Sequence, residues 1–186
     1  MRLRAAHVPA AGGAVLEVGI GSGLNLPFYT SAVTHLAAVD PSRELLDMAR
    51  QRAAAAPFPV ELFQRDASAL PLASDSIDTV VMTWSLCSIA TPDVTLREIR
   101  RVMKSSAALI FVEHGLSPDA GVQKWQNRLT PVWRRLAGGC HLNRDVRHLI
   151  QAAGFAIRAC EVGYMPGPRP ATYTYQGQAM KTEISK

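Results

Sequence analysis

Cysteine, aromatic side chains and long hydrophobic runs are all scarce in this sequence of 186 residues. The three cysteines, Cys87, Cys140 and Cys160, are an odd number without CxxC spacing, so we expect neither a disulfide framework nor a metal site. No apolar run approaches the roughly 18 residues that a membrane-spanning helix needs. Residues 1–7 lack the apolar stretch of a secretory signal. These absences favour a cytoplasmic protein.

The composition is that of one globular domain. A chain of this length fits a single domain and can bury a core without metal or disulfide crosslinks. Hydrophobic residues make up 48% of the sequence, which is ordinary for a folded protein. We therefore expect residues 1–186 to form one domain.

The net charge of +5 comes with two clusters of basic residues. They contain Arg97, Arg100, Arg101 and Lys104, and then Arg128, Arg134, Arg135, Arg144 and Arg147. Such runs are usually solvated helix faces. Aromatic residues do not alternate with these charges, as a binder of single-stranded nucleic acid would require. We expect no nucleic-acid partner and at most peripheral contact with a membrane.

Short β-branched runs alternate with helical patterns, which predicts βαβ units and a mostly parallel sheet. The expected strands are residues 14–18, 35–39, 60–63, 77–83, 107–113, 155–162 and 172–178. Helices are expected after the cap Ser42, at 93–103, within 117–139, and from Asn143 or Asp145 to a glycine stop at Gly154. The proline- and glycine-rich segment 166–170 favours a hairpin-like connection, which would make the last strand antiparallel.

A glycine-rich turn follows the first expected strand. Its residues are Glu17, Gly19, Gly21, Gly23 and Asn25. Such a turn lets a ligand approach the backbone, but nicotinamide enzymes use one as well. The dinucleotide fingerprint calls for Gly or Ala where Leu24 stands. The Glu17 carboxylate would repel a pyrophosphate, whereas it suits the ammonium and sulfonium charges of S-adenosylmethionine (SAM).

Two further carboxylates follow strand ends. Asp40, before Pro41, ends the second expected strand near the ~20-residue offset at which a carboxylate meets ribose hydroxyls in such sheets. Adjacent parallel strands end side by side, so Asp40 should lie across from the glycine turn. Asp66, before Ala67, follows the third strand, where a carboxylate or backbone group can bond an adenine amine. Taken singly, either residue could be a helix cap or a local turn.

Taken in order, these positions resemble the motif series of the class I SAM-dependent methyltransferases, the methyltransferase type 11 group. Residues 70–78, with Leu-Pro-Leu and Asp-Ser-Ile-Asp, and residues 96–104, Leu-Arg-Glu-Ile-Arg-Arg-Val-Met-Lys, resemble two further motifs of that superfamily. The resemblance covers residues 15 to about 180. It implies a Rossmann-like α/β fold with a seven-stranded, mostly parallel sheet, an antiparallel last strand and helices on both faces.

A narrower likeness exists to the animal methyltransferases of alkyl thiols and their bacterial relatives. It rests on residues 15–29, 86–88, 111–114 and 125–144. The resemblance implies that SAM binds and leaves as S-adenosylhomocysteine. The residues that would hold it are Glu17, Gly19, Gly21, Gly23, Asn25, Asp40, Pro41, Asp66, Ala67, Trp84 and Ser85. Trp84 and Ser85 would flank the sulfonium and the acceptor, with a helical insertion at 115–142 near the acceptor site.

The sequence departs from the family pattern in two places. The usual glycine-containing turn before the fifth strand is Lys104-Ser105-Ser106-Ala107 here. Relatives also carry a helical lid before the first strand, and residues 1–13 are too short for a lid helix of normal length. We therefore expect a pocket open on one side, with weak SAM binding or cover from a second copy in a homodimer.

No single catalytic residue stands out. Methyl transfer from SAM depends mainly on positioning, and a thiol or phenol acceptor needs at most a modest base. His114 and His141 are the candidates, since histidine titrates in the right range, although either could be structural. Cys87 and Cys140 are expected to be buried and inert. Trp125 and Trp133 are expected to pack, with a roof over the acceptor site as the alternative.

The sequence leaves several functions open. The leading hypothesis is methyl transfer to a small apolar acceptor, a thiol or a quinone- or phenol-like ring. A phospholipid headgroup amine is the alternative acceptor, suggested by the basic clusters. Other classes are a SAM-binding protein without turnover and an NAD-dependent oxidoreductase, the latter disfavoured by Glu17 and Leu24.

Overall fold

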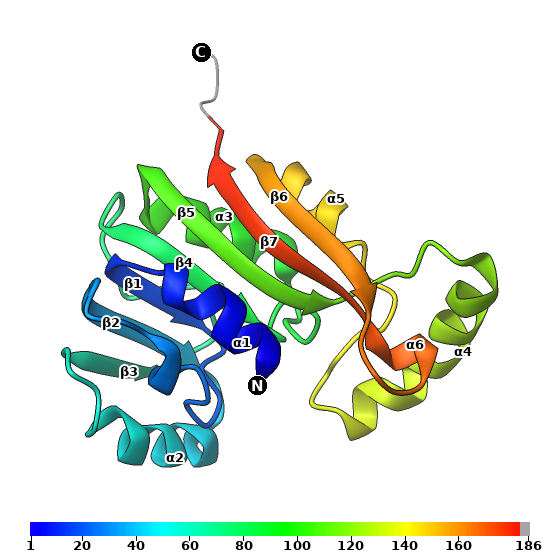
Figure 1. Ribbon diagram of the computed structural model, residues 1–186, viewed down its shortest axis with the longest axis horizontal. Coiled ribbons are helices and arrows are strands. Elements are labelled where there is room, and N and C mark those ends of the chain that lie inside the picture. Colours follow the sequence, from blue (N-terminus) through cyan, green and yellow to red (C-terminus); the bar gives the residue numbers. More distant parts are fainter. Residues whose placement is uncertain (183–186) are drawn as a thin grey trace.

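The computed structural model describes residues 1–182, which form one seven-stranded sheet with helices on both faces (Figure 1). The strands are β1 (Gly13–Val18), β2 (Val33–Asp40), β3 (Val60–Gln64), β4 (Ile77–Thr83), β5 (Met103–His114), β6 (Phe155–Tyr164) and β7 (Tyr173–Lys181). The α-helices are α1 (Arg2–His7), α2 (Arg43–Ala53), α3 (Pro92–Val102), α4 (Ala120–Leu136), α5 (Val146–Ala152) and α6 (Arg169–Thr172). Two short 3-10 helices, η1 (Val8–Ala10) and η2 (Leu26–Phe28), complete the set.

The strand order is β3-β2-β1-β4-β5-β7-β6. β1 to β5 pair in parallel, and β7 is antiparallel to both β5 and β6. The expected fold, with its antiparallel last strand, is confirmed. β6 and β7 are joined by a hairpin whose connection contains the one-turn helix α6, because its prolines do not allow a long crossover helix.

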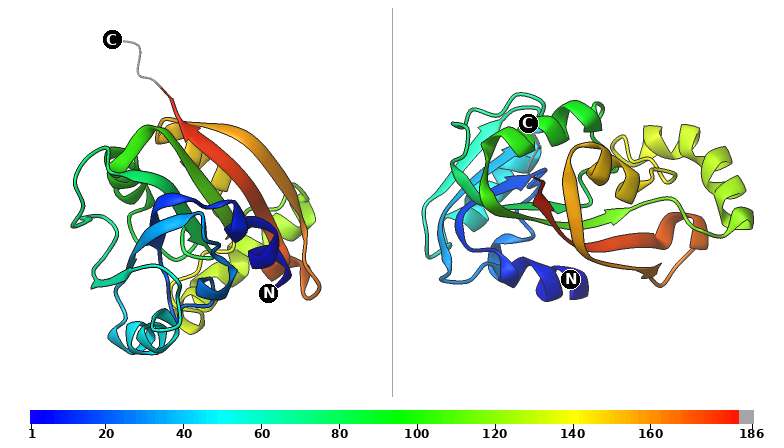
Figure 2. Two further views of the ribbon diagram at one scale, coloured as in Figure 1. Left: turned by 60° about the vertical axis from the view of Figure 1, so that its left-hand side comes forward. Right: turned by 90° about the horizontal axis from the view of Figure 1, so that it is seen from above.

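Each face of the sheet carries its own apolar layer. β1 is buried on both faces, as is typical of central parallel strands: Leu16 faces one layer and Val15 the other. α3 and α5 close the first layer, while α2 and η1 close the second. Figure 2 shows the helices distributed on the two sides of the sheet. Within residues 1–182, no helix is both long and apolar enough to cross a bilayer.

The caps and stops read from the sequence fall as expected. Ser42 Oγ accepts a hydrogen bond from Leu45 N at 3.2 Å. Of the two candidate caps for the later helix, Asp145 is the one used, since it accepts from His148 N at 3.0 Å. Gly154 follows α5 with φ +83°, a left-handed conformation that favours glycine at a helix end.

The expected turn at residues 104–107 is wrong. α3 ends at Val102 and β5 begins at Met103, which pairs with Ile77 of β4. Both paired residues are buried, so the chain enters the sheet directly. The pairing register shifts between Ile77 and Thr79, and this irregularity accommodates Ser105 and Ser106.

The expectation that the basic clusters are solvated holds for Arg97, Arg128, Arg134, Arg135 and Arg147, which are exposed, but not for Arg101 and Arg144. Arg101 donates to the Glu98 carboxylate and to Leu72 O at 2.9 Å. Arg144 is half-buried and donates to two carbonyl oxygens of the loop that follows β4. Arg101 therefore ties a loop to α3, and Arg144 ties the loop after β4 to the segment after α4, which charge counting along a sequence cannot show.

Candidate functional site

A cavity of about 500 Å³ lies at the carboxyl ends of β1, β2 and β4, and we call it the main cavity. β1 has β2 on one side and β4 on the other, so the strand order reverses here, where α/β sheets bind ligands. Its lining includes Gly19, Gly21, Asp40, Pro41, Asp66, Ala67, Trp84 and Ser85, all named from the sequence. The fold thus brings together residues far apart in the chain.

The glycine turn uses each glycine for a different reason. Gly19 has φ +75°, and a Cβ there would lie 2.5 Å from Ser85 Cβ. Gly23 has φ +81°, and its Cβ would lie 3.2 Å from Ala49 Cα of α2. Gly21 has φ +55°, and a Cβ there would meet nothing within 4 Å. Two glycines therefore allow close packing, while Gly21 faces open space in the cavity.

Asp40 joins the end of β2 to the glycine turn. The residue is only 7% exposed and lines the main cavity. Its Oδ2 accepts from Gly21 N at 2.8 Å, and its Oδ1 accepts from Ser42 N at 2.9 Å. A carboxylate can accept about four hydrogen bonds. These two backbone bonds hold the group in place and leave capacity for the hydroxyl groups of a ligand.

Asp66 and Ala67 form a second wall of the main cavity after β3. Asp66 Oδ1 accepts from Ser68 N at 2.8 Å, a local turn of the kind expected for an isolated aspartate. The turn and the cavity position are compatible, because only one carboxylate oxygen is used.

Glu17 is buried beneath the glycine turn rather than exposed to a cavity. Its two oxygens accept from Asn25 Nδ2 at 2.9 Å and from Tyr29 Oη at 2.8 Å. Burial raises the pKa of Glu17 to about 7, although these two hydrogen bonds oppose the shift. Glu17 lines none of the cavities described here, so direct contact with a ligand stays a prediction. The hydrogen bond from Asn25 links the Glu17 carboxylate to the glycine turn.

A smaller cavity of about 190 Å³, the turn cavity, adjoins the glycine turn. Arg4, Gly21, Asn25 and Trp84 are among its lining residues. Among the described residues, Asn25 Oδ1 and Arg4 Nε are buried without a hydrogen-bond partner. Unpaired buried polar atoms are costly, and both residues line the turn cavity, where a polar ligand group would offer them a partner.

The amino-terminal residues form part of this wall. α1 carries Arg4, whose guanidinium lies 4.5 Å from the centroid of the Trp84 ring. Figure 1 shows α1 in front of the sheet. The short segment therefore makes a helix of six residues beside the site, where no lid helix of normal length was expected.

Trp84 is the residue that the cavities share. It adopts φ +54°, a left-handed conformation that is strained for a tryptophan, while its N donates to Val112 O at 2.7 Å. It lines the main cavity, the turn cavity and a third, outer cavity of about 1,020 Å³. His114 also lines the outer cavity, with its ring centroid 6.3 Å from that of Trp84.

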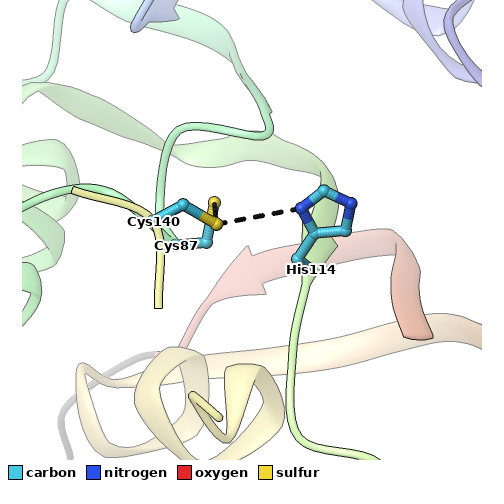
Figure 3. Close-up of side chains that lie close together, drawn as sticks. All are labelled: Cys87, His114 and Cys140. Atoms are coloured by element: carbon cyan, nitrogen blue, oxygen red, sulfur yellow. Dashed lines mark hydrogen bonds between the residues drawn. The ribbon is translucent and has the colours of Figure 1, made fainter. Parts of the chain in front are cut away.

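The fold also assembles a cluster that cysteine spacing did not predict. Cys87, His114 and Cys140 place one sulfur or nitrogen atom each within 4.8 Å of one another (Figure 3). The two sulfurs are 3.4 Å apart, and Cys140 Sγ lies 3.9 Å from His114 Nδ1. The contact between the two thiols lowers the pKa of Cys140 and raises the pKa of Cys87. The two cysteines are buried, as expected, but they lie together with His114. That they are inert stays a prediction.

Glu113 is a functional candidate that the sequence analysis missed. It is fully buried, and it accepts from three backbone N–H groups of the loop after β4, at 2.9 to 3.1 Å from Ser85, Leu86 and Cys87. Burial raises its pKa to about 6. A carboxylate that ends an otherwise apolar strand was the available signal.

The two candidate bases lie differently. His114 borders the outer cavity, whereas His141 Nδ1 lies 3.2 Å from Cys87 O and lines none of the described cavities. Burial lowers the pKa of His141, and the nearby Arg144 adds to this shift. A catalytic role for either stays a prediction. Trp125 is 56% exposed, so the expectation that it packs is wrong, whereas Trp133 is 37% exposed and its side chain contacts the Cys140 thiol.

Comparison with known proteins identifies relatives of this chain. The methyltransferase domain family matches residues 16–111, about half of the chain. The chain is 32% identical to thiol S-methyltransferase TMT1B of Rattus norvegicus, over 76% of this chain and 59% of that protein. It is 38% identical to phosphatidylethanolamine N-methyltransferase of Cereibacter sphaeroides, over 66% of this chain and 63% of that protein.

Among solved structures, a SAM-dependent methyltransferase from Methanosarcina mazei has a TM-score of 0.70. It covers 91% of this chain and 92% of its own at 20% identity, so the likeness extends to the fold. The chain spans less than two thirds of the length of the two relatives named above.

Proposed function

The chain belongs to the class I SAM-dependent methyltransferases, and from that premise we propose that it transfers a methyl group from SAM to a small apolar acceptor. The acceptor is a thiol or a phenol- or quinol-like ring. The observation that carries the proposal is the main cavity, in which the glycine turn, Asp40 and Trp84 meet. Its volume of about 500 Å³ lies within the ~300–1,000 Å³ typical of ligand pockets.

The residues present fit SAM along its length. Asp40 would accept from the ribose hydroxyls, and Asp66 with Ala67 would border the adenine. In the turn cavity, the unpaired Asn25 Oδ1 would accept from the ammonium group, and the unpaired Arg4 Nε would donate to the carboxylate. Gly21 leaves the space that the chain between these ends requires.

SAM supplies an activated methyl group when it is bound, and the protein's contribution is to position the reactants. Trp84 forms a shared wall of the cofactor side and the outer cavity. Glu113 fixes the backbone that carries Ser85, and so holds this wall. His114, which borders the outer cavity, would take a proton from an acceptor thiol or phenol.

The lining of the outer cavity is mixed, so it would suit an acceptor with an apolar part and a polar part. Leu3, Tyr164, Met165 and Pro166 contribute apolar surface. Polar and charged groups come from Arg2, Arg4, His7, His114, Glu161 and Gln176. The relative from Rattus norvegicus is named for thiols, which favours a thiol. The relative from Cereibacter sphaeroides is named for phosphatidylethanolamine, so a headgroup amine is the second candidate.

Other features of the sequence prediction remain proposals. SAM binding without turnover would leave the same cavity in place, and a nicotinamide cofactor is disfavoured by family membership. A cytoplasmic location and a homodimer also stay predictions. The single domain expected at residues 1–186 stays one too, with residues 183–186 outside the described part.

Methyl transfer from radiolabelled SAM tests the proposal. The parent chain is offered small thiols, a quinol and phosphatidylethanolamine, with Asp40→Asn as the variant deficient in cofactor binding. We expect label in a thiol or quinol with the parent and none with the variant. Label only in phosphatidylethanolamine would replace the acceptor, and label in none of them, with SAM bound, would indicate a protein without turnover.

A further inference from the structure

The cluster of Cys87, His114 and Cys140 has the composition of a zinc site. We propose that these three side chains bind one Zn²⁺ ion. Two thiolates and an imidazole are ligands that zinc prefers, and a site with three protein ligands leaves one position open. The donors come from the loop after β4, the end of β5 and the segment after α4, so no local motif announces them.

The distances fit tetrahedral zinc before any ion is added. Zn–S bonds of about 2.3 Å and a Zn–N bond of about 2.0–2.1 Å put two sulfurs about 3.8 Å apart and sulfur and nitrogen about 3.5 Å apart. The observed separations are 3.4 Å between the sulfurs and 3.9 Å between Cys140 Sγ and His114 Nδ1. Shifts of a few tenths of an ångström would bring these two separations to the zinc values. Cys87 Sγ, which lies within 4.8 Å of the His114 ring nitrogen, would also move closer to that nitrogen on binding. Figure 3 shows the three side chains pointing toward one another.

The backbone around the cluster is already fixed. His141 N, next to Cys140, donates to Cys87 O at 2.8 Å, so the two cysteine segments are tied at the site itself. Cys87 N donates to Glu113, the neighbour of His114, at 3.1 Å. Each ligand is thus held by a hydrogen bond to the segment of another ligand, and preorganised ligands bind metal more tightly.

The local charge also suits a divalent cation. Two thiolates bound to Zn²⁺ balance its two positive charges, whereas two ionised thiols without a cation would repel each other. Binding displaces the thiol protons to solvent and involves no oxidation.

Of the three ligands, neither cysteine lines the main, turn or outer cavity, whereas His114 lines the outer cavity. Water or a sulfur or nitrogen group of a ligand would reach the open position from that side. The zinc site itself does not depend on the identity of the methyl acceptor, but an imidazole that binds zinc has no free nitrogen lone pair, so His114 would act as a base only in the zinc-free chain.

Zinc titration of the full, reduced chain tests this site, with Cys160→Ser as the matched control. Cys160 is partly exposed and lies outside the cluster. We expect one Zn²⁺ per chain in the parent and in Cys160→Ser. Loss of one ligand should cost on the order of 100-fold or more in affinity in Cys87→Ser, Cys140→Ser and His114→Gln. Equal zinc affinity in the parent and in Cys140→Ser would overturn the proposal.

Alkylation of the parent provides a test that needs no variant. Zn²⁺ should protect Cys87 and Cys140 from iodoacetamide while Cys160 reacts, as read by mass spectrometry. Equal labelling of all three with and without zinc would contradict the site. Spontaneous formation of a Cys87–Cys140 disulfide, with no zinc bound by the reduced protein, would assign the pair to redox chemistry instead.

An independent observation concerns α4, whose outward face is apolar. We call five of its residues the apolar stripe: Trp125, Leu129, Val132, Trp133 and Leu136, each more than a third exposed. Val132 and Leu136 reach 58% and 80% exposure. Their spacing of four, three, one and three residues keeps them on one side of a helix. Figure 1 shows α4 at the far end of the molecule from β3.

The inward face of α4 is mostly polar. Gln126 bonds Ser117 N and Gly115 O, each at 3.0 Å, and Thr130 bonds Gln126 O at 2.7 Å. A surface helix normally buries its apolar residues and exposes polar ones, and this helix does the reverse. An exposed apolar stripe of this kind marks an interaction surface.

A row of positive charge flanks the apolar stripe. Lys124, Arg128 and Arg135 are exposed, and helical spacing places them together beside the stripe. Apolar residues with tryptophan, next to a basic row, are typical of helices that lie in a membrane interface. We propose that α4 docks on an anionic lipid surface, with the apolar stripe inserted and the basic row at the headgroups.

Co-sedimentation with phosphatidylcholine vesicles, with and without phosphatidylserine, tests this docking. We expect binding that needs phosphatidylserine, weakens with salt and falls by about tenfold or more in the double variant Trp125→Ser, Leu136→Ser. Met48→Ser changes an apolar residue on α2 that is 46% exposed, and this variant should bind like the parent. Unchanged binding in the double variant would overturn the proposal. A parent chain that binds no vesicles would also overturn it. If light scattering then showed a dimer in the parent and a monomer in the double variant, the apolar stripe would be a dimer interface instead.

Discussion

Asp40 and Glu17 are both acidic residues beside the glycine turn, yet their surroundings give them different tasks. Asp40 lines the main cavity and holds Gly21 through its backbone N–H. Glu17 is sealed below the turn and holds Asn25. From the sequence alone, we expected both carboxylates to contact the cofactor. A position at the end of a strand does not reveal that Tyr29 and Asn25 cover Glu17, while Asp40 lines the main cavity.

Asp40→Asn should weaken SAM binding. The amide keeps the shape and one acceptor, but the hydroxyl groups of a ribose lose a charged partner worth about 1.5–3 kcal/mol. We expect SAM affinity to fall by about tenfold or more in isothermal titration. Asp47→Asn, on the exposed face of α2, is the control and should bind like the parent. Parent-like binding by Asp40→Asn would show that the ribose lies elsewhere.

Glu17 should make stability depend on pH. Burial raises its folded pKa to about 7 from the ordinary 4.5, so the folded state holds its proton longer than the unfolded chain. The stabilisation is fully present below pH 4.5 and is lost as pH rises to about 7. The loss amounts to about 3 kcal/mol.

Urea denaturation at pH 5 and pH 8, on the parent and on Glu17→Gln, measures this contribution. The neutral amide cannot ionise, so the parent should lose more stability between the two pH values than the variant does. The difference between the two proteins isolates Glu17 from other titrating groups. An identical pH dependence in both would mean that Glu17 titrates normally.

At the scale of elements, the glycine turn is the feature whose geometry matters most for binding. Gly21→Ala adds a methyl group that meets no protein atom but enters the cavity, on a backbone with φ +55°. Strain of about 1–2 kcal/mol should lower the melting temperature by several degrees. SAM affinity should fall by about tenfold or more in titration, beyond what reduced stability explains for a protein that is still folded. Undiminished affinity would mean that no ligand passes Gly21.

The helix α1 provides a second test at this scale. Arg4→Met keeps an apolar stem over Trp84 but removes the unpaired donor in the turn cavity. We expect SAM affinity to fall by about tenfold. Arg2→Met, on the exposed side of the same helix, should leave it unchanged. Equal affinities would show that α1 does not contact the cofactor.

The elements themselves were largely predictable, and the exceptions have physical causes. Alternation of apolar runs identified all seven strands, because strands buried on both faces are continuous in sequence. The start of β5 at Met103 was missed, since its pairing with Ile77 depends on tertiary contacts. The outward apolar stripe of α4 was read as packing, because periodicity shows that a helix has an apolar side and not which way that side faces.

At the scale of the whole molecule, the three cavities converge on Trp84. The lining of the main cavity was predictable, because its residues follow successive strand ends and parallel strands end along one edge. The cluster of Cys87, His114 and Cys140 was not, since its members come from segments that only the folded chain brings together. The pairing of Glu113 with the loop after β4 was hidden for the same reason.

A crystal structure of the chain with S-adenosylhomocysteine tests the central claim most directly. The account predicts ribose hydroxyls on Asp40, adenine beside Asp66 and Ala67, and the amino-acid end in the turn cavity at Asn25 and Arg4. The product sulfur would lie against Trp84. Density for the ligand at any place other than the glycine turn, in a crystal soaked to saturation, would contradict the account.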